Sequence, residues 1–271
     1  MITAASNTRI KEVSRLIAQP KARREQGRFV AEGVKMFLEA PEDQLCEVYV
    51  SDLFLDRCRN DSGFLTEEVR AACEEKLLQC GYETVADGVM RKISDTQTPQ
   101  GVICVLSQPA YTLSVFFRKP NPLLLLLEDI QDPGNLGTML RTAEGAGADG
   151  VLMSKGTADM YNPKTIRSTM GSVYRMPFLY TEDLTDIMGM LQSKGIRISA
   201  AHLQGAVSYD RVSYLEGCAI LIGNEGRGLK EGTVKMADRT VMIPMAGQVE
   251  SLNAAVASAV LLYEAARQRR A

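Results

Sequence analysis

Residues 123–143 read LLLLLEDIQDPGNLGTMLRTA. The leucines of Leu123–Leu127 form an uninterrupted apolar run, which is typical of a strand buried on both faces of a parallel sheet. Pro133 and Gly134 predict a turn, after which Leu136–Ala146 has the spacing of a helix. A buried strand, a short turn and a helix in succession predict an α/β domain.

The alternation of strands and helices continues to the end of the chain. Short apolar runs predict strands over Gly150–Met153, Ile196–Ala200, Ala219–Ile222 and Thr240–Ile243. Helical spacing predicts helices over Pro163–Met170, Leu184–Ser193 and Leu252–Arg267. Apolar strands separated by helices predict a mostly parallel sheet with helices on both faces.

The first part of the chain predicts a smaller α/β unit. Strands are expected over Arg28–Val30, Glu47–Val50, Thr84–Ala86 and Val102–Leu106. Helices are expected around Ile10–Ile17, over Gly33–Leu38 and over Thr66–Gln79. Proline and asparagine in Ser107-Gln-Pro109 and Lys119-Pro-Asn-Pro122 disfavour regular structure. The predicted organisation is one unit over residues 1–107, a linker over 108–121 and a second domain over 122–271.

Composition indicates a soluble, cytoplasmic protein that needs neither disulfides nor a metal. Its 271 residues, 45% of them hydrophobic, can bury a sizeable core. The cysteines at 46, 58, 73, 80, 104 and 218 include no CxxC pair, which argues against a zinc site and predicts reduced thiols. The apolar run Leu123–Leu127 is far too short to cross a bilayer, and the N-terminus lacks the apolar core of a signal peptide.

Positive charge is concentrated near the N-terminus, although the net charge of the chain is −2. Within residues 9–28, only Glu12 and Glu25 oppose a set of basic side chains. That set comprises Arg9, Lys11, Arg15, Lys21, Arg23, Arg24 and Arg28. Such local patches are typical of nucleic-acid-binding proteins, but a solvated helix face would produce the same pattern.

Two further features could suggest other chemistry. Residues 145–150 read GAGADG and match the GxGxxG pattern of dinucleotide-binding folds. In those folds the glycines follow a strand and open a helix, whereas here they follow a predicted helix and precede a strand, which argues against a dinucleotide site. His202 is the one histidine of the chain; it follows a predicted strand and could line a pocket, but an ordinary loop histidine is the favoured interpretation.

Three segments place polar side chains after predicted strands. In the first, quoted above, Asn135 stands at the expected helix start, where its side chain could cap the backbone. Arg141 follows six residues later, within two helical turns, so that it could project near the same end. A capped helix with a surface arginine is the alternative explanation.

The second segment, residues 219–229, reads AILIGNEGRGL. Glycines directly after an apolar strand permit a tight turn and a close approach of the backbone to a ligand. Glu225 stands within that turn at the carboxyl end of a strand, the usual position of a binding site in a parallel sheet. A simple connection between two elements would give the same pattern.

The third segment, residues 241–257, reads VMIPMAGQVESLNAAVA. A strand ends at Ile243-Pro244, a polar loop follows, and Ser251 or Asn253 is placed to cap the long final helix. The alanines of the first helical turns would allow another group to pack closely against the backbone.

In order and spacing, the three segments together resemble the signature motifs of the SpoU/TrmH family of SPOUT methyltransferases, over roughly residues 120–267. Arg28-Phe-Val-Ala-Glu-Gly33 and Thr98-Pro-Gln-Gly101 also resemble the small, ribosomal-protein-like RNA-binding domain that precedes the methyltransferase domain in this family. The resemblance implies a C-terminal SPOUT-type α/β domain with a trefoil knot, S-adenosylmethionine as cofactor, and a homodimer with the active site at its interface.

By the same resemblance, Arg141 occupies the position of the catalytic arginine, and Asn135, Glu225, Ser251 and Asn253 complete the polar site. Since an arginine stays protonated, we expect Arg141 to bind a phosphate and stabilise a developing alkoxide rather than remove a proton. Gly223, Ile243 and Leu252 would contact the cofactor, with Ala201 to Gly205 closing over it. RNA would be held by Arg9, Lys11, Arg15, Arg23, Arg24 and Arg28.

The implied reaction is methyl transfer to a ribose 2′-hydroxyl of RNA, with rRNA favoured over tRNA because of the two-domain organisation. A catalytically silent RNA-binding protein of the same fold is an alternative, which the presence of Arg141, Glu225 and Asn253 disfavours. Two further alternatives are methylation of a base and methylation of a small molecule. The arginine-bearing first motif disfavours the former, and the basic stretch over residues 9–28 disfavours the latter.

Overall fold

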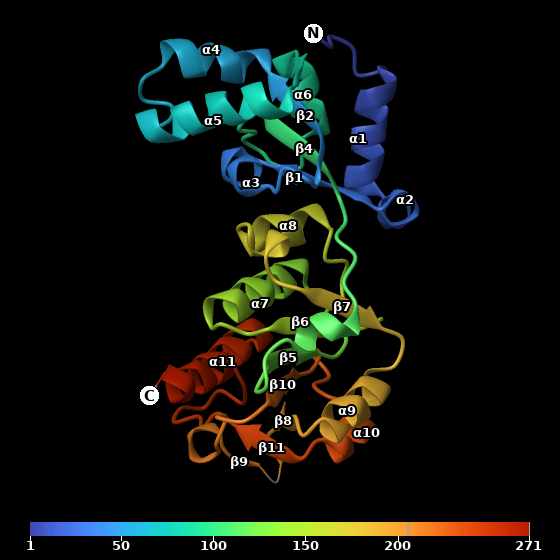
Figure 1. The fold of residues 1–271 in the computed structure, drawn as a ribbon, viewed down its shortest axis with the longest axis vertical. Helices are drawn as coiled ribbons and strands as arrows, with labels where there is room; N and C mark the ends of the chain where they lie inside the picture. Colours follow the sequence, from blue (N-terminus) through green and yellow to red (C-terminus); the bar gives the residue numbers. More distant parts are fainter. Residues whose placement is uncertain (205, 271) are drawn as a thin grey trace. The chain divides into compact units, whose positions relative to one another are not determined.

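The computed structural model describes residues 1–204 and 206–270 (Figure 1). The chain forms two compact units. The first comprises Met1–Ala110 and Tyr161–Tyr174, and the second comprises Tyr111–Met160 and Arg175–Ala271. None of the described helices is both long enough and apolar enough to span a bilayer.

The first unit is built around a mixed sheet with the strand order β1-β4-β2-β3. These strands are β1 (Arg28–Glu32), β2 (Leu45–Ser51), β3 (Glu83–Val85) and β4 (Val102–Ser107). β4 is antiparallel to both β1 and β2, whereas β3 runs parallel to β2. The accompanying helices are α1 (Thr8–Ala18), α2 (Pro20–Gln26), α3 (Val34–Glu39), α4 (Asp52–Asn60), α5 (Glu67–Cys80) and α6 (Asp87–Ile93). The short α2, α4 and α6 were not predicted from the sequence.

Helix α1 has the amphipathic character that its sequence predicts. Ile10, Val13 and Leu16 recur at helical spacing and are buried against the sheet, where Tyr49 and Ile103 belong to the same core. The basic side chains of α1 lie on its outer face and are exposed to solvent. The helix therefore holds positive charge on the surface of the first unit.

A segment from the middle of the chain packs as part of the first unit. It contains α8 (Pro163–Thr169) and an adjoining 3-10 turn over Ser172–Tyr174. The ring of Tyr161 lies 4.7 Å from that of Phe29, centroid to centroid, and the hydroxyl of Tyr174 donates a hydrogen bond to the carbonyl oxygen of Met36 at 3.1 Å. The core of the first unit thus includes residues that follow it in sequence by more than fifty positions.

The second unit contains a parallel sheet with the strand order β7-β6-β5-β10-β8-β11-β9 in the described part of the chain. Its strands are β5 (Leu123–Leu127), β6 (Gly150–Ser154), β7 (Phe178–Thr181), β8 (Arg197–Ala201), β9 (Val207–Ser208), β10 (Cys218–Ile222) and β11 (Arg239–Met242). The predicted α/β fold with a mostly parallel sheet is confirmed. β7 and β9, which are short and only partly buried, were not predicted.

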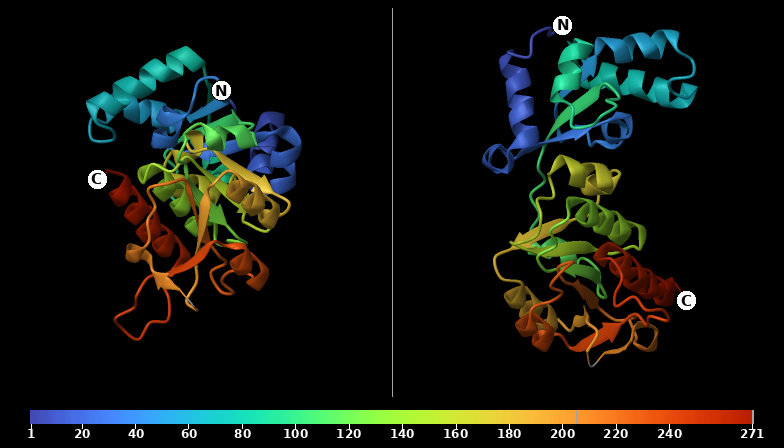
Figure 2. Two further views of the ribbon diagram at one scale, coloured as in Figure 1. Left: turned by 60° about the horizontal axis from the view of Figure 1, so that its bottom comes forward. Right: turned by 180° about the vertical axis from the view of Figure 1, so that it is seen from behind.

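Helices cover both faces of this sheet, as Figures 1 and 2 show. α7 (Pro133–Gly145) and α11 (Ala254–Arg270) pack together on one face, and α9 (Leu184–Ser193) and α10 (Glu231–Met236) on the other. Leu124 and Leu126 of β5 share a core with the apolar side of α9. Because side chains alternate along a strand, the remaining leucines of β5, which are also buried, face the α7 side. The strand is thus leucine at every position because both of its faces are covered.

Candidate active site at the carboxyl ends of the parallel strands

The three polar segments meet at one edge of the sheet in the second unit. They follow β5, β10 and β11, and the register places β10 directly beside β5 and β8 directly beside both β10 and β11. In a parallel sheet, neighbouring strands present their carboxyl ends at the same edge, where ligands usually bind. Segments that are about ninety residues apart in sequence are therefore brought side by side.

A cavity of about 440 Å³ opens at this edge. It is lined by residues 201–204, 222–229, 241–243, 245, 250–252, 254, 257 and 261. Its volume falls within the range of small-molecule and cofactor sites. Of the residues predicted to bind cofactor, Ala201, Gly223, Ile243 and Leu252 line the cavity, whereas Gly205 lies outside the described residues.

The glycine turn, residues 223–229, forms one wall of the cavity. Asn224 and Gly228 exchange two backbone hydrogen bonds, at 3.1 and 2.9 Å, and the side-chain oxygen of Asn224 accepts from the backbone N–H groups of Gly226 and Arg227. A Cβ atom on Gly223 would lie 2.4 Å from the carbonyl carbon of Gly228. Glycine is required at position 223 because the backbone closes on itself there.

Glu225 points from this turn to the start of α7. Its carboxylate accepts hydrogen bonds from the backbone N–H groups of Gln131 and Asp132, both at 3.0 Å, and from the side-chain amide of Asn135 at 3.1 Å. Partial burial works against ionisation, but these hydrogen bonds outweigh it and hold the pKa of Glu225 below its ordinary value. Glu225 is therefore an ionised anchor at neutral pH and a poor proton acceptor.

Asn135 and Asn253 extend this contact to the third segment. The side-chain amide of Asn253 donates to the side-chain oxygen of Asn135 at 3.1 Å. The side-chain oxygen of Asn253 in turn accepts from the backbone N–H of Ala255 at 2.9 Å and caps α11. Glu225, Asn135 and Asn253 thus form a hydrogen-bonded chain that joins all three segments.

The helix starts differ in detail from those predicted. α7 begins at Pro133, and the residue that caps it is Asp132, whose carboxylate accepts from the backbone N–H of Asn135 at 2.8 Å. Asn135 is therefore not the cap, and its side chain is free for the contacts described above. For α11 the sequence allowed Ser251 or Asn253, and the cap is Asn253. Ser251 instead lines the cavity and is exposed.

Arg141 stands apart from this cluster. It is exposed on α7 and does not line the cavity. Six residues correspond to about 240° around the axis of a helix, so Arg141 and Asn135 project from different faces of α7. The structure thus brings Asn135, Glu225, Ser251 and Asn253 to one edge of the sheet, whereas it leaves Arg141 on the outer surface of the same helix.

The predicted RNA-binding residues of the first unit differ in exposure. Lys11 and Arg24 are exposed, and three arginines form ion pairs with carboxylates: Arg9 with Glu83, Arg15 with Glu12 and Glu25, and Arg28 with Glu47. Arg23 is only 2% exposed, and its guanidinium donates to the carbonyl oxygens of Leu16 and Ile17 at 2.7 and 2.9 Å. This corrects the prediction that Arg23 binds RNA: its guanidinium donates hydrogen bonds to carbonyl groups at the end of α1 and does not face solvent.

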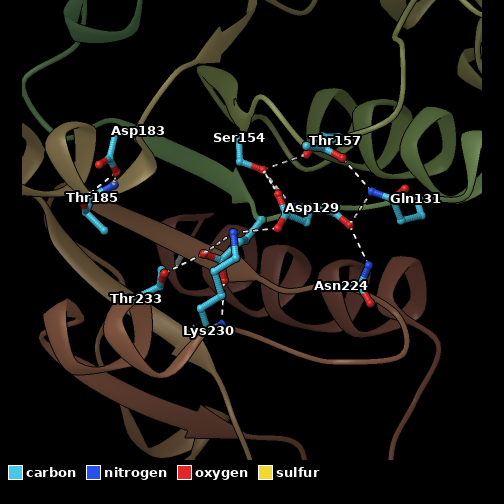
Figure 3. Close-up of polar contacts among 11 residues, drawn as sticks. Asp129, Gln131, Ser154, Thr157, Asp183, Thr185, Asn224, Lys230 and Thr233 are labelled. Atoms are coloured by element: carbon cyan, nitrogen blue, oxygen red, sulfur yellow. Dashed lines mark hydrogen bonds and ion pairs between the residues drawn. The ribbon is translucent and has the colours of Figure 1, made fainter.

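Sequence reasoning missed a charged cluster beside the glycine turn, shown in Figure 3. Asp129 follows β5 in a left-handed backbone conformation, with φ of 54°, and forms an ion pair with Lys230 at 2.7 Å. Glu128 is buried and accepts a hydrogen bond from the backbone N–H of Lys230. No local pattern marked Glu128, Asp129 or Lys230, because their partners are distant in sequence. His202 was not missed: of its two sequence interpretations, a pocket residue or an ordinary loop histidine, the structure supports the first, because His202 lines the cavity.

A parallel α/β domain with a cofactor-sized cavity at the carboxyl ends of its strands defines the class of α/β enzymes that bind a small-molecule cofactor. Residues 122–263 match the SpoU rRNA methylase family, and residues 7–104 match the MRM3-like substrate binding domain.

The 23S rRNA (guanosine(2553)-2'-O)-methyltransferase RlmP of Bacillus subtilis is 32% identical over 97% of each chain. The structure of the AdoMet-bound rRNA methyltransferase from Sinorhizobium meliloti has a TM-score of 0.82 at 30% identity, covering 98% of this chain and 97% of that one. The SpoU methyltransferase AviRb from Streptomyces viridochromogenes also has a TM-score of 0.82, at 26% identity, covering 97% and 98%.

The chain belongs to the SpoU rRNA methylase family. The predictions of the family, of S-adenosylmethionine as cofactor and of an RNA 2′-O-methyltransferase are confirmed.

Proposed function

We propose that the protein transfers a methyl group from S-adenosylmethionine to a ribose 2′-hydroxyl of 23S rRNA. The observation that carries the proposal is the hydrogen-bonded chain of Glu225, Asn135 and Asn253, which lies beside the cavity at the strand ends. The printed activity of the Bacillus subtilis relative, which matches over almost the whole chain, supports 23S rRNA. Acting on rRNA would place the protein with the ribosome, in the cytoplasm.

The cavity fits S-adenosylmethionine in size and in the character of its walls. It is large enough for a nucleoside-sized ligand, and Gly223 lets the backbone of the glycine turn approach that ligand closely. Ala201, Gly223, Ile243 and Leu252 are the residues that we expect to hold it. When bound, the cofactor supplies an electrophilic methyl group on a sulfonium.

The polar residues then orient the reaction rather than carry out proton transfer. Glu225 stays ionised because three hydrogen bonds lower its pKa, and it holds both the start of α7 and the side chain of Asn135. Asn135 is held at both its amide nitrogen and its oxygen, so it can present only a single orientation to a substrate. Ser251 lines the cavity and is exposed, so its hydroxyl can contact a ribose hydroxyl.

Arg141 supports the proposal of a homodimer. Its guanidinium can bind a phosphate of the RNA and can stabilise the negative charge that develops on the 2′-oxygen. It projects from the outer side of α7, which packs beside α11, and on α11 Val256 and Tyr263 are 49% and 47% exposed. Burial of these apolar side chains against a second copy would form a symmetric interface that includes Arg141.

The first unit is proposed to bind the RNA, in line with its match to a substrate-binding domain. Lys11 and Arg24 are exposed to solvent. Arg9, Arg15 and Arg28 form ion pairs with carboxylates, and phosphates of the RNA could take the place of those carboxylates. We also propose a trefoil knot in the second unit. Its support is the path of the chain after β11. β8 separates β11 from β10 in the sheet, and yet α11, which follows β11, packs against β10 and α7.

The experiment is transfer of labelled methyl from S-adenosylmethionine to 23S rRNA, 16S rRNA and tRNA, each transcribed without modifications, followed by digestion to nucleosides. A labelled 2′-O-methylnucleoside from 23S rRNA alone is the expected result. Label in tRNA, or a methyl group retained on the free base, would replace the proposal by one of the alternative activities. Cofactor binding without transfer to any of the three RNAs would favour a silent RNA-binding protein.

A further inference from the structure

Both ends of the glycine turn are tied to the two residues that follow β5. At the first end, the side-chain amide of Asn224 donates to the carbonyl oxygen of Asp129 at 2.7 Å. At the second end, the ammonium group of Lys230 lies 2.7 Å from the carboxylate of Asp129, and the backbone N–H of Lys230 donates to Glu128 at 2.8 Å. Figure 3 shows the two ties converging on Asp129. The methyl-transfer chemistry proposed above uses neither Asp129 nor Lys230.

Asp129 is itself held rigidly, so it can serve as a fixed point. The hydroxyl of Ser154 donates to its carboxylate at 2.7 Å and accepts from its backbone N–H at 2.8 Å. A Cβ atom on Gly156 would lie 2.2 Å from that carboxylate, so the carboxylate occupies space that any other residue at position 156 would fill. The left-handed backbone of Asp129, with φ of 54°, is one that aspartate tolerates better than most residues.

The contact is more than an isolated surface ion pair. An exposed pair alone contributes little, and the side chain of Lys230 is 66% exposed. Lys230 nevertheless also lies 3.9 Å from the carboxylate of Glu128, which is only 4% exposed and accepts a further hydrogen bond from Thr233 at 2.5 Å. The hydrogen bond with Lys230 lowers the pKa of Asp129, and that with Asp129 raises the pKa of Lys230, so both remain charged at neutral pH.

We propose that Asp129 and Lys230 are positioning residues for the cofactor: their ion pair holds the glycine turn in the shape that binds S-adenosylmethionine. The proposal rests on the function assigned above and extends it to residues outside the cavity wall. Since the pair acts through the turn and not on the reacting atoms, its loss weakens cofactor binding while leaving the rate at saturating cofactor nearly unchanged. Because the two residues act as a pair, removal of either one also removes the contribution of the other to cofactor affinity.

The test uses the full chain with the substitutions Asp129→Asn, Lys230→Met, the two combined, and Lys230→Arg. Lys235→Met is the matched control, because Lys235 forms a similar ion pair with Glu231 on α10 but does not contact the turn. For each variant, the Kd of S-adenosylmethionine is measured by calorimetry, and the KM for cofactor and the kcat are measured with the unmodified RNA that accepts the methyl group. Thermal unfolding of each variant gives its folded fraction at the assay temperature.

The expected result is a rise of about three- to tenfold in Kd and KM for Asp129→Asn and for Lys230→Met. The double variant should be no weaker than the worse single variant, Lys230→Arg should bind within about twofold of the wild type, and kcat should change by less than about twofold. A Kd within about twofold of wild type for both single variants would overturn the proposal. It would also be overturned if the losses of cofactor affinity in the single variants added up in the double variant, or if kcat fell while KM stayed unchanged. Absence of cofactor binding by the wild type would instead contradict the proposed function itself.

Discussion

The side-chain amide of Asn135 donates a hydrogen bond to the carboxylate of Glu225 at 3.1 Å, across a sequence separation of ninety residues. This contact is possible because β5 and β10 are neighbours in register, so that the segments following them leave the sheet at the same edge. Two motifs that look unrelated along the chain thereby become one structure, with Asn253 of the third motif bonded to the same asparagine.

Replacement of Arg141 by alanine should abolish methyl transfer, by at least about a hundredfold, because the charge that binds phosphate and stabilises the developing alkoxide is lost. Cofactor affinity should be nearly unchanged, since Arg141 does not line the cavity. Calorimetry with S-adenosylmethionine and a methyl-transfer assay separate the two effects, and Arg118→Ala, at another exposed arginine, is the control. A comparable loss of cofactor affinity in Arg141→Ala would contradict the assigned role.

Substitution of Gly223 by alanine should raise the Kd of S-adenosylmethionine by more than about tenfold, because its Cβ would overlap the backbone of Gly228 and Leu229 and force the turn open. Gly232→Ala is the matched control. A Cβ atom at Gly232 meets no neighbour within 4 Å, and alanine favours the helix there. Equal cofactor affinity in the two variants would rule out the close approach of the turn.

Glu225 should make the stability of the protein sensitive to acid. Its pKa in the folded protein lies below the ordinary value of 4.5, so its contribution is fully present above that value and is lost as the pH falls through the lowered pKa. Thermal unfolding midpoints measured between pH 3 and pH 7 should therefore fall more steeply below about pH 4 for the wild type than for Glu225→Gln. Glu231→Gln, at an exposed helical position, should follow the wild-type curve.

Replacement of two neighbouring arginines of α2 should affect two different properties of the protein. Arg23→Ala should destabilise the protein by about 2–4 kcal/mol, because it empties a buried site and leaves the carbonyl oxygens at the end of α1 without donors. Arg24→Ala should leave stability within about 0.5 kcal/mol and should lower affinity for RNA in a salt-dependent manner. Denaturant unfolding and filter binding at two salt concentrations measure the two quantities, and a reversed assignment would refute this division.

The parts of the fold that the sequence predicts well are those with a strong periodic pattern. β5 and α9 have the bounds expected, because an all-leucine run and a helical repeat leave no competing structure. For α7 the sequence predicts a start at Leu136, three residues late, because Pro133 and Gly134 are typical of a turn. Proline is in fact favoured in the first turn of a helix, where its missing N–H would be unpaired in any case.

The parts that could not be predicted depend on contacts between distant residues. The pattern of charge suggested an outward-facing Arg23, since nothing in the local sequence shows that the carbonyl groups of α1 need a donor. Asp129 and Lys230 are about a hundred residues apart, and their pairing depends on the register of β5 with β10. The polar residues of the three motifs were predicted as a set because the family resemblance preserves their spacing, but their hydrogen bonds could be assigned only from the structure.

The packing of Tyr161–Tyr174 within the first unit has a consequence for protein engineering. The chain passes from one unit to the other at three points, after Ala110, after Met160 and after Tyr174, so neither unit can be excised with a single cut. A fragment ending at Ala110 would lose the tyrosine that stacks on Phe29, and a chimera that exchanged only the N-terminal part would pair that phenylalanine with a foreign segment. Any exchange of the first unit between relatives must therefore carry two separate stretches of sequence, and the second of them is enclosed within the coding sequence of the second unit.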